Sequence, residues 1–259
     1  LVSSAGPEPA DDRFRLAWDK LRELKADIID EHCYAAPRWF LDNAGRYDNY
    51  DRKGPKVFMG EYAAQSVMVG SPDNRNSWKC ALYEAAFMTG LERNGDLVRM
   101  ACYAPLFGHE EAWQWRPDLI WFDHLHSCGS ANYYVQKCFS LNTGSRLLPV
   151  EVKNLDAALL QTGALHTSAT LDEKNREIIL KVVHSGSQPL AATVDLKGLA
   201  KGSRKATVIV LRANDLAAEN SLELPKNIYP QEEPVTFKTP RFTFTFQPYS
   251  LTIIRLSAR

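Results

Sequence analysis

Three groups of reactive side chains directly follow stretches that read as buried strands. The groups are Glu31, His32 and Tyr34; Glu61; and Asp123, His124 and His126. In a parallel α/β fold such strand ends meet at one face, which is where a barrel places its chemistry. The strand from Lys56 to Gly60 is the clearest, because an apolar run ends on a glycine that is followed at once by a carboxylate. Spacing alone leaves a second interpretation open, in which Glu61 ends a strand and faces water.

The residue types are those of a sugar site, where carboxylates bind hydroxyl groups and aromatic rings pack on the sugar. The aromatic candidates are Tyr34, Tyr62, Trp113, Trp115 and Trp121. Glycoside hydrolysis with retention needs two carboxyl groups about 5 Å apart, one as nucleophile and one as acid/base. Glu31 and Glu61 are the only obvious pair. Strand alternation sends Glu31 and His32 to opposite faces, so the sequence leaves open whether this pair forms.

Other reaction classes have weaker support. Asp123, His124 and His126 suggest a metal site, but a further ligand at regular spacing is absent, and we expect no metal and no other cofactor. The sequence contains neither a GxSxG elbow nor a GxGxxG or GxxxxGK[ST] nucleotide loop. The five cysteines are widely spaced and never form a CxxC pair, which predicts mostly core thiols.

The composition is that of a globular protein with one large domain or two moderate ones. Of the 259 residues, 45% are hydrophobic and 24% are charged. The 31 basic and 31 acidic residues balance, so we expect neither a nucleic acid nor a membrane as a partner. No apolar run approaches the roughly 20 residues that cross a bilayer.

The first half alternates strand-like and helical patterns, as a parallel sheet requires. Helices are expected from Asp11, with Phe14, Trp18, Leu21 and Leu24 on one face; around Trp39–Tyr47; from an N-cap at Ser77 to Asn94-Gly95; over Leu97–Phe107; and over Asn132–Phe139. A strand ending at a Gly6-Pro7 turn opens the chain, which suggests that it begins within a fold. About four strands are expected, the last over Pro117–Asp123. We therefore predict half of a (β/α)8 barrel.

The composition changes near Leu147-Leu148-Pro149-Val150, and two-residue alternation follows. Strands are expected at 178–183, 192–196, 206–211, 242–246 and 251–256. In one of them Phe242, Phe244 and Phe246 share a face, which predicts a core stripe. Short strands at this spacing indicate an antiparallel sandwich. We predict a catalytic half-barrel at 1–146 and a β-sandwich at 147–259.

Several motifs, in this order along the chain, resemble the α-L-arabinofuranosidases of glycoside hydrolase family 51. They are Asp30-Glu31-His32-Cys33-Tyr34, Arg46-Tyr47-Asp48, Gly60-Glu61-Tyr62-Ala63, Leu91-Glu92-Arg93-Asn94, Trp115-Arg116-Pro117-Asp118, Asn132-Tyr133-Tyr134 and Phe244-Thr245-Phe246-Gln247-Pro248. The resemblance covers nearly the whole chain. It implies an α/β plus all-β fold, the C-terminal part of a (β/α)8 TIM barrel followed by an antiparallel β-sandwich.

The resemblance also implies roles for site residues. Glu61 corresponds to the family's nucleophile after the seventh barrel strand, and His32 and Tyr34 correspond to substrate-binding residues after the sixth. The family's acid/base is a Glu preceded by Asn, and no Asn-Glu dipeptide occurs in this chain. A sugar-contacting Gln after the eighth strand has no clear match, with Ser130 or Asn132 in that neighbourhood. We therefore expect the acid/base and about half of the barrel to be missing from this chain.

The implied reaction is retaining hydrolysis that releases terminal α-L-arabinofuranosyl residues from arabinan- or arabinoxylan-type polysaccharides. The implied partners are an arabinose-containing oligo- or polysaccharide, and either a second copy of the chain or a complementary N-terminal barrel half. The substrate class favours an extracellular or periplasmic location. Two alternatives stay open, a non-catalytic carbohydrate-binding or assembly fragment and a related retaining glycosidase such as a xylosidase.

Overall fold

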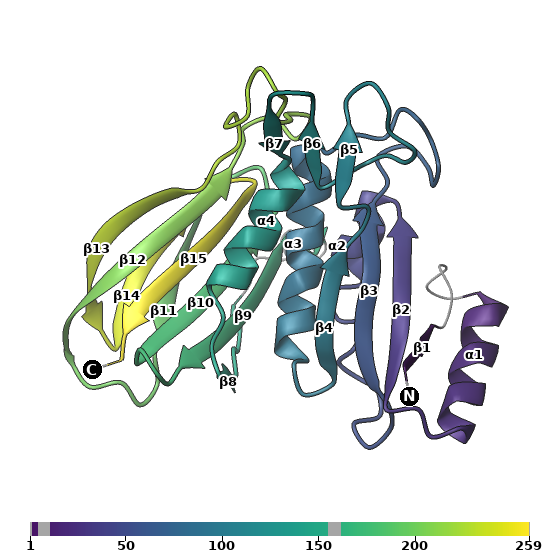
Figure 1. Ribbon diagram of the computed structural model, residues 1–259. Coiled ribbons are helices and arrows are strands. Elements are labelled where there is room, and N and C mark those ends of the chain that lie inside the picture. Colours follow the sequence, from purple (N-terminus) through teal and green to yellow (C-terminus); the bar gives the residue numbers. More distant parts are fainter. Residues whose placement is uncertain (1, 5–10, 155–161, 259) are drawn as a thin grey trace.

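The computed structural model describes residues 2–4, 11–154 and 162–258, and these form two parts that meet at a pair of helices (Figure 1). The first part is built on a parallel sheet, and the second is a β-sandwich. Gly6 and Pro7, predicted as a turn, lie outside the described residues. No helix within the described ranges has both the length and the apolar character needed to cross a membrane.

The first part alternates strands and helices as predicted. Its elements are β1 (Val2–Ser4), α1 (Asp12–Glu23), β2 (Ile28–Ala35), α2 (Pro37–Asp42), β3 (Lys56–Ala64), α3 (Trp78–Arg93), β4 (Val98–Tyr103), β5 (Phe107–His109), β6 (Ile120–Phe122), β7 (Ser127–Gly129) and α4 (Ala131–Leu141). Strands β1 to β4 pair in chain order, and every pair is parallel. The predicted C-terminal part of a barrel is confirmed.

The starts of two helices follow from local sequence signals. Asp11 and Ser77 are the N-caps of α1 and α3, and each side chain accepts a hydrogen bond from a backbone N–H in the first turn. The predicted apolar face of α1 is buried except for Leu24, which is the C-cap residue and is 56% exposed. The helix ends at Glu23, so Leu24 lies outside it and does not continue the buried face.

The helix predicted over Leu97–Phe107 is wrong. Residues Val98–Tyr103 form β4, which pairs with β3, and this long-range pairing overrides the local pattern. The strand predicted over Pro117–Asp123 exists only as the short β6, in a separate three-stranded sheet with β5 and β7. The fourth strand of the parallel sheet is therefore β4 and not β6.

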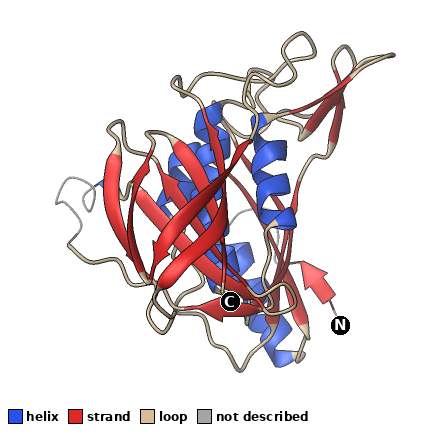
Figure 2. Cartoon of the chain, turned by 90° about the vertical axis from the view of Figure 1, so that its left-hand side faces the viewer, coloured by secondary structure: helices blue, strands red, loops and turns tan. Residues whose placement is uncertain are grey.

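The second part is an antiparallel sandwich, as predicted. Its strands are β8 (Arg146–Leu148), β9 (Leu165–Asp172), β10 (Glu177–His184), β11 (Leu190–Asp195), β12 (Gly202–Arg212), β13 (Gln231–Thr239), β14 (Arg241–Phe246) and β15 (Ser250–Ser257). A six-stranded sheet packs against the pair β11–β14, and both lie in front of the helices in Figure 2. Phe242, Phe244 and Phe246 pack into the core between these sheets. The boundary predicted after residue 146 falls within β8, which pairs with β9, and stays a prediction.

Helix α3 joins the two parts, because it packs on β3 and β4 and also on β9, β10 and β15 of the sandwich (Figure 1). The sandwich part also satisfies the first backbone donors of this helix. The N–H groups of Trp78 and Lys79 donate to the carbonyl groups of Ala218 and Leu216, each at 2.8 Å. The indole N–H of Trp78 donates to the carbonyl of Tyr249, also at 2.8 Å. The contact between the parts is thus both apolar and hydrogen-bonded.

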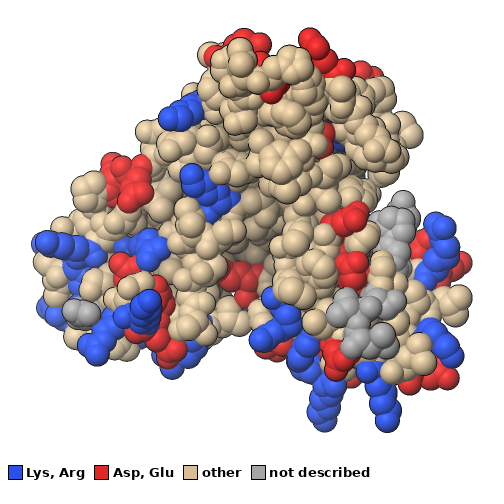
Figure 3. Space-filling view, in the orientation of Figure 1, with Lys and Arg blue, Asp and Glu red and all other residues tan. Residues whose placement is uncertain are grey.

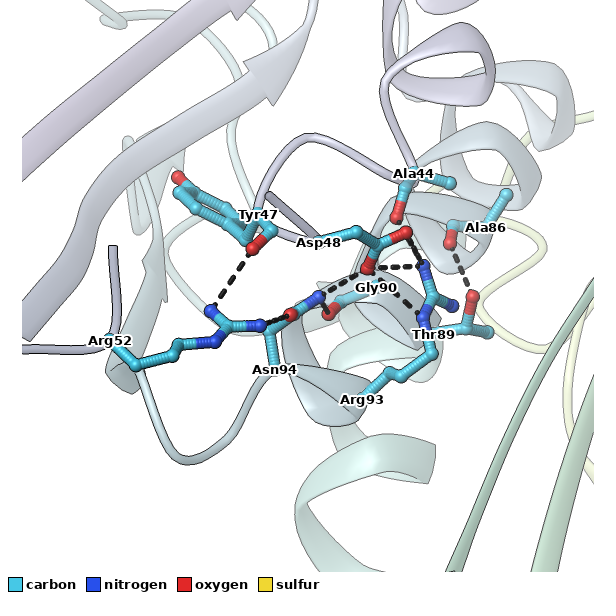
Figure 4. A network of polar contacts seen from close by, with 9 residues as sticks. All are labelled: Ala44, Tyr47, Asp48, Arg52, Ala86, Thr89, Gly90, Arg93 and Asn94. Atoms are coloured by element: carbon cyan, nitrogen blue, oxygen red, sulfur yellow. Dashed lines mark hydrogen bonds and ion pairs between the residues drawn. The ribbon is translucent and has the colours of Figure 1, made fainter. Parts of the chain in front are cut away.

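A polar network holds the loop before β3 against the last turn of α3 (Figure 4). Arg93 and the side-chain amide of Asn94 both donate to Asp48, the amide at 2.8 Å. Gly90 allows the close approach, because a Cβ there would lie 1.9 Å from the carbonyl oxygen of Ala44. This is the end at which the parallel strands begin, where barrel residues serve stability. We therefore assign the network a structural role.

A buried ion pair fixes α3 to the sandwich. Lys181 of β10 is fully buried, and its Nζ donates to Oε1 of Glu92 at 2.5 Å and to the carbonyl of Asn142 at 2.6 Å. The hydroxyl of Ser168 donates to the other oxygen of Glu92 at 2.5 Å. Burial lowers the pKa of Lys181, and the charge of Glu92 opposes that shift. Loss of either partner would leave the other at a buried position without a partner of opposite charge.

We expect Lys181→Met to lower the free energy of unfolding by about 3–5 kcal/mol, because Glu92 is left as an uncompensated charge at a largely buried position. Urea unfolding of the purified protein measures this loss. The double variant Lys181→Met/Glu92→Gln is neutral at both positions and keeps an acceptor for Ser168, so it should recover much of the stability. A double variant no more stable than the single one would contradict this account.

Candidate active site

Strand β2 presents three polar side chains on one face by regular alternation. Asp30, His32 and Tyr34 share the face opposite to that of the buried residues, which include Glu31. The strand runs on to Ala35, so these residues lie within β2 and not after its end as the sequence suggested. Their common face is the one that the helices leave uncovered.

Strand β3 does not alternate strictly, and Gly60 is the reason. Met59 and Tyr62 are both buried on the helix side although they are an odd number of positions apart. Glu61 pairs with His32 of β2, and the register shift just before this pair leaves Gly60 as the extra residue of a β-bulge. The bulge moves the alternation by one position and turns Glu61 to the face that carries His32.

Glu61, Tyr34 and His32 form the candidate site. The hydroxyl of Tyr34 donates to Oε2 of Glu61 at 2.6 Å, and Nδ1 of His32 lies 3.4 Å from the same oxygen. The other ring nitrogen of His32, Nε2, is 2.8 Å from Oδ2 of Asp30. The side chain of Glu61 is 43% exposed, and Oε1 accepts no hydrogen bond within the described part of the chain. One carboxylate oxygen of Glu61 is thus held, while the other keeps its acceptor positions open.

The electrostatics keep Tyr34 a hydrogen-bond donor. Burial raises the pKa of its hydroxyl far above the usual value, and both the hydrogen bond to Glu61 and the charge of that residue raise it further. The phenol therefore keeps its proton at neutral pH and donates to Glu61.

The pair of Glu31 and Glu61 does not form. Glu31 is 1% exposed and lies on the helix side of β2. It accepts hydrogen bonds from the indole of Trp18 at 2.9 Å, the hydroxyl of Tyr47 at 2.7 Å and Nε of Arg46 at 3.2 Å. Its role is to anchor α1 and the loop before β3 to the back of the sheet.

The group Asp123, His124 and His126 is not part of this cluster, because it follows β6 of the separate three-stranded sheet. Backbone N–H groups of Leu125 and His126 donate to Asp123 at 2.7 and 2.6 Å and lower its pKa to about 2. Asp123 and His124 line a different cavity of about 510 Å³, which also includes residues 219–223. Over the described residues, no three His, Cys, Asp or Glu side chains are grouped to hold a metal ion.

Other residues considered for sugar contacts are used elsewhere in the fold. Tyr62 is buried among aromatic rings on the helix side of β3, and Trp121 lines the separate cavity. Ser130 caps α4 and donates its hydroxyl to the carbonyl of Leu119 at 2.7 Å. Asn132 is buried in a polar network described below. Of these candidates, Tyr34 is the one that contacts Glu61.

Surface charge is mixed on the face shown in Figure 3. Lys and Arg side chains are interspersed with Asp and Glu over its lower part, whereas acidic side chains gather at the upper end, where Figure 1 shows β5, β6 and β7. The cavity at that end is lined partly by acidic side chains, which include Glu110, Glu111, Asp123 and Glu223. Arg75 and Arg116 also line this cavity, so its acidic side chains outnumber the basic ones without excluding them.

Two residues behind the cluster, Asp30 and Gly60, were not predicted as site residues. Asp30 contacts His32, and Gly60 makes room for it, because a Cβ on Gly60 would lie 2.0 Å from Oδ1 of Asp30. The available signal was the two-residue spacing from Asp30 to His32, which places both on one face of a strand. Packing against a neighbouring strand left no signal in the sequence.

A buried glutamate supports the end of β3. Glu84 of α3 accepts hydrogen bonds from the N–H of Ala64 and from the amide of Asn132, both at 2.7 Å. Asn76 in turn donates to Asn132 and accepts from the indole of Trp121, both at 2.9 Å. The indole of Trp121 can only donate, so Asn76 must accept with its side-chain oxygen and donate to Asn132 with its NH₂ group. The NH₂ group of Asn132 then faces Glu84, which accepts at one oxygen from Asn132 and at the other from Ala64.

Comparison with known proteins identifies similar chains. A family model described as the α-L-arabinofuranosidase C-terminal domain matches residues 60–250. An extracellular exo-α-L-arabinofuranosidase of Streptomyces chartreusis is 53% identical over 149 residues, which is 58% of this chain and 17% of that protein. α-L-Arabinofuranosidase 2 of Arabidopsis thaliana is 37% identical over 213 residues, which is 80% of this chain and 30% of that protein.

A solved structure covers almost the whole chain. The arabinose-bound α-L-arabinofuranosidase MgGH51 is 31% identical, with a TM-score of 0.85, over 99% of this chain and 39% of its own. The chain thus spans well under half the length of each of these three relatives.

We expect Gly60→Ala to lower the free energy of unfolding by about 1–3 kcal/mol, because the new Cβ would overlap the carboxylate of Asp30. Urea unfolding measures the change. Gly202→Ala is the matched control on another strand, since a Cβ there meets nothing within 4 Å. If both variants were as stable as the parent, the tight approach of Asp30 to β3 would be wrong.

Glu84 predicts a pH dependence of stability. Burial raises the pKa of Glu84 from the ordinary 4.5 to about 8, although its two hydrogen bonds act to lower it. The folded chain therefore binds more protons than the unfolded chain between these values, and this contribution to the free energy of unfolding falls as pH rises from 4.5 to about 8. Glu84→Gln should flatten that slope, although its NH₂ group also lowers stability at every pH. Chemical unfolding at several pH values measures this, with Glu23→Gln as the control at an exposed position.

Proposed function

We infer the function of this chain from its family: it belongs to the α-L-arabinofuranosidases of glycoside hydrolase family 51, as a C-terminal part. We propose that it supplies the nucleophile of a retaining glycosidase, and that this nucleophile is Glu61. The observation that carries the proposal is the half-exposed carboxylate of Glu61 among parallel strands, with one oxygen held by Tyr34 and the other open. His32 and Tyr34 are the proposed substrate-binding residues.

The first step of the proposed reaction is attack by Oε1 of Glu61 on the anomeric carbon of a terminal α-L-arabinofuranosyl group. The bond to the glycosidic oxygen breaks, and an acid/base residue gives this oxygen a proton. The hydrogen bond from Tyr34 to Oε2 holds the carboxylate in one orientation, so the attacking oxygen is already aimed when the sugar arrives.

The second step is hydrolysis of the ester between the sugar and Glu61. Water attacks the anomeric carbon, its proton passes to the acid/base, and the electron pair of the broken bond returns to the Glu61 carboxylate. Tyr34 and His32 both face Oε2, which shares by delocalisation the negative charge that returns to the carboxylate. The Tyr34 hydroxyl is a donor already in place, so it stabilises this charge without reorganising.

We propose that the acid/base lies outside this chain, in a complementary N-terminal barrel half. Support comes from the absence of an Asn-Glu dipeptide and from the fraction of the solved relative that this chain covers, 39%. Asp30 is no substitute, because one of its oxygens contacts His32 and the other is buried against Gly60. In this proposal residues 1–146 carry the chemistry and residues 147–259 support them.

The proposed substrate is an arabinose-containing oligo- or polysaccharide. The names of the relatives support this class, since the Streptomyces protein is called an exo-α-L-arabinofuranosidase and the solved relative has arabinose bound. Aryl glycosides of arabinofuranose and of xylopyranose separate this proposal from a xylosidase. Activity toward the xyloside alone would contradict it.

We expect a mechanism-based furanosyl inhibitor to form an ester with Glu61 in the full-length protein that carries this chain, because the trapped intermediate retains the nucleophile. Peptide mapping by mass spectrometry locates the label. Glu61→Gln should lower kcat by about 10⁴-fold or more, whereas the exposed Glu111→Gln should leave it unchanged. A label on any other residue would refute the assignment.

The chain by itself tests the position of the acid/base. Without that residue it should hydrolyse an aryl arabinofuranoside at no more than about a thousandth of the rate of the full-length protein. Full activity of the isolated chain, abolished by Glu61→Gln, would show that the acid/base is within it. Saccharide binding without hydrolysis in the full-length protein would favour a non-catalytic fragment instead.

A further inference from the structure

A second carboxylate lies behind His32, and the proposed reaction does not use it. Oδ2 of Asp30 is 2.8 Å from Nε2 of His32, while the other ring nitrogen faces Glu61. We propose that Asp30 is a positioning residue for the nucleophile, which holds the imidazole of His32 so that Nδ1 can donate to Glu61. This inference rests on the proposed role of Glu61.

The backbone fixes the place of Asp30. It lies two residues before His32 on the same face of β2, and its carboxylate packs over the bulge at Gly60, where any Cβ would collide with it. Oδ1 of Asp30 is buried and has no hydrogen-bond partner among the described residues. A carboxylate oxygen in that position is unfavourable by itself. Among the described residues, the hydrogen-bond partner of the Asp30 carboxylate is therefore His32.

The donor and acceptor chemistry assigns the role. An ionised carboxylate only accepts hydrogen bonds, so Asp30 requires an N–H at Nε2 of His32. The carboxylate of Glu61 is also only an acceptor, at 3.4 Å from Nδ1. A ring with a proton on both nitrogens attracts both carboxylates, whereas a ring with one proton turns a lone pair toward one of them. By its contact with Nε2, Asp30 holds the ring so that Nδ1 faces Oε2 of Glu61.

This arrangement acts differently on the two chemical steps. A donor at Oε2 stabilises the carboxylate of Glu61, which helps it to leave when the ester bond breaks in the second step. The same donor gives no such help in the first step, where the carboxylate loses its charge. Loss of Asp30 should therefore slow the second step more than the first, so that the ester of Glu61 accumulates.

The test is steady-state kinetics of Asp30→Asn in the full-length protein that carries this chain, with an aryl arabinofuranoside as substrate. Asn keeps the size of the side chain and removes its charge. We expect kcat to fall about 10- to 100-fold, the range for a lost hydrogen bond to a charged group. KM should fall in parallel, kcat/KM should change less than about threefold, and intact-mass spectrometry should show more glycosylated enzyme at steady state than in the parent.

Glu31→Gln is the matched control, because Glu31 is the next residue and lies on the opposite, structural face of β2. It should lower the free energy of unfolding without lowering kcat and KM together. Asp30→Ala, which removes the acceptor as well as the charge, should slow ester hydrolysis at least as much as Asp30→Asn.

The outcomes separate this inference from the proposed function. If the inhibitor labels Glu61 but kcat is unchanged in both Asp30 variants, the inference is overturned and the proposed function stands. Equal falls in kcat and kcat/KM without accumulated ester also overturn it, and so does an Asn variant that fails to fold, since Asp30 would then serve stability. A label on another residue overturns the proposed function and the inference together.

Discussion

The extra residue that Gly60 adds to β3 determines where Glu61 points. Without the bulge, the alternation that buries Met59 on the helix side would bury Glu61 there as well, beside the apolar core. Tyr34 and His32 reach the open face by ordinary alternation of β2, so the cluster forms only because β3 changes phase opposite them. The other contacts of the site depend on that local shift.

The same strands place two carboxylates, Glu31 and the proposed nucleophile Glu61, in very different surroundings. Glu31 is fully enclosed and accepts hydrogen bonds from several side chains, which compensate for the loss of water. Glu61 is only partly enclosed, and its Oε1 is open. A carboxylate satisfied at both oxygens is a poor nucleophile, whereas one held at a single oxygen is oriented and still reactive. Neighbouring strands thus place the same residue type in two environments, one that suits a structural role and one that suits the proposed nucleophile.

Local signals in the sequence predicted the elements that local interactions decide. The N-caps at Asp11 and Ser77 and the phenylalanine stripe of β14 are of this kind, because each depends on neighbours in the chain or on strand period. The strand β4 was mistaken for a helix, since its pairing partner lies far away in sequence. Strand position singled out Glu61, His32 and Tyr34, and the family resemblance gave them roles. Asp30 and Gly60 stand in the same motifs but received no role, because a bulge is a property of two paired strands.

In the proposed enzyme the missing barrel half does more than provide an acid/base. The four-stranded sheet pairs on only one side at β1 and at β4, and the face that carries Glu61 and His32 has no covering layer within the described chain. In water the attraction between charges 4 Å apart is only about 1 kcal/mol, and it grows severalfold once the site is enclosed. The contacts that Tyr34 and His32 make with Glu61 therefore reach their full effect only when the other strands exclude water from this face. In the proposed enzyme, Glu61 therefore becomes fully active as a nucleophile only when the barrel is closed.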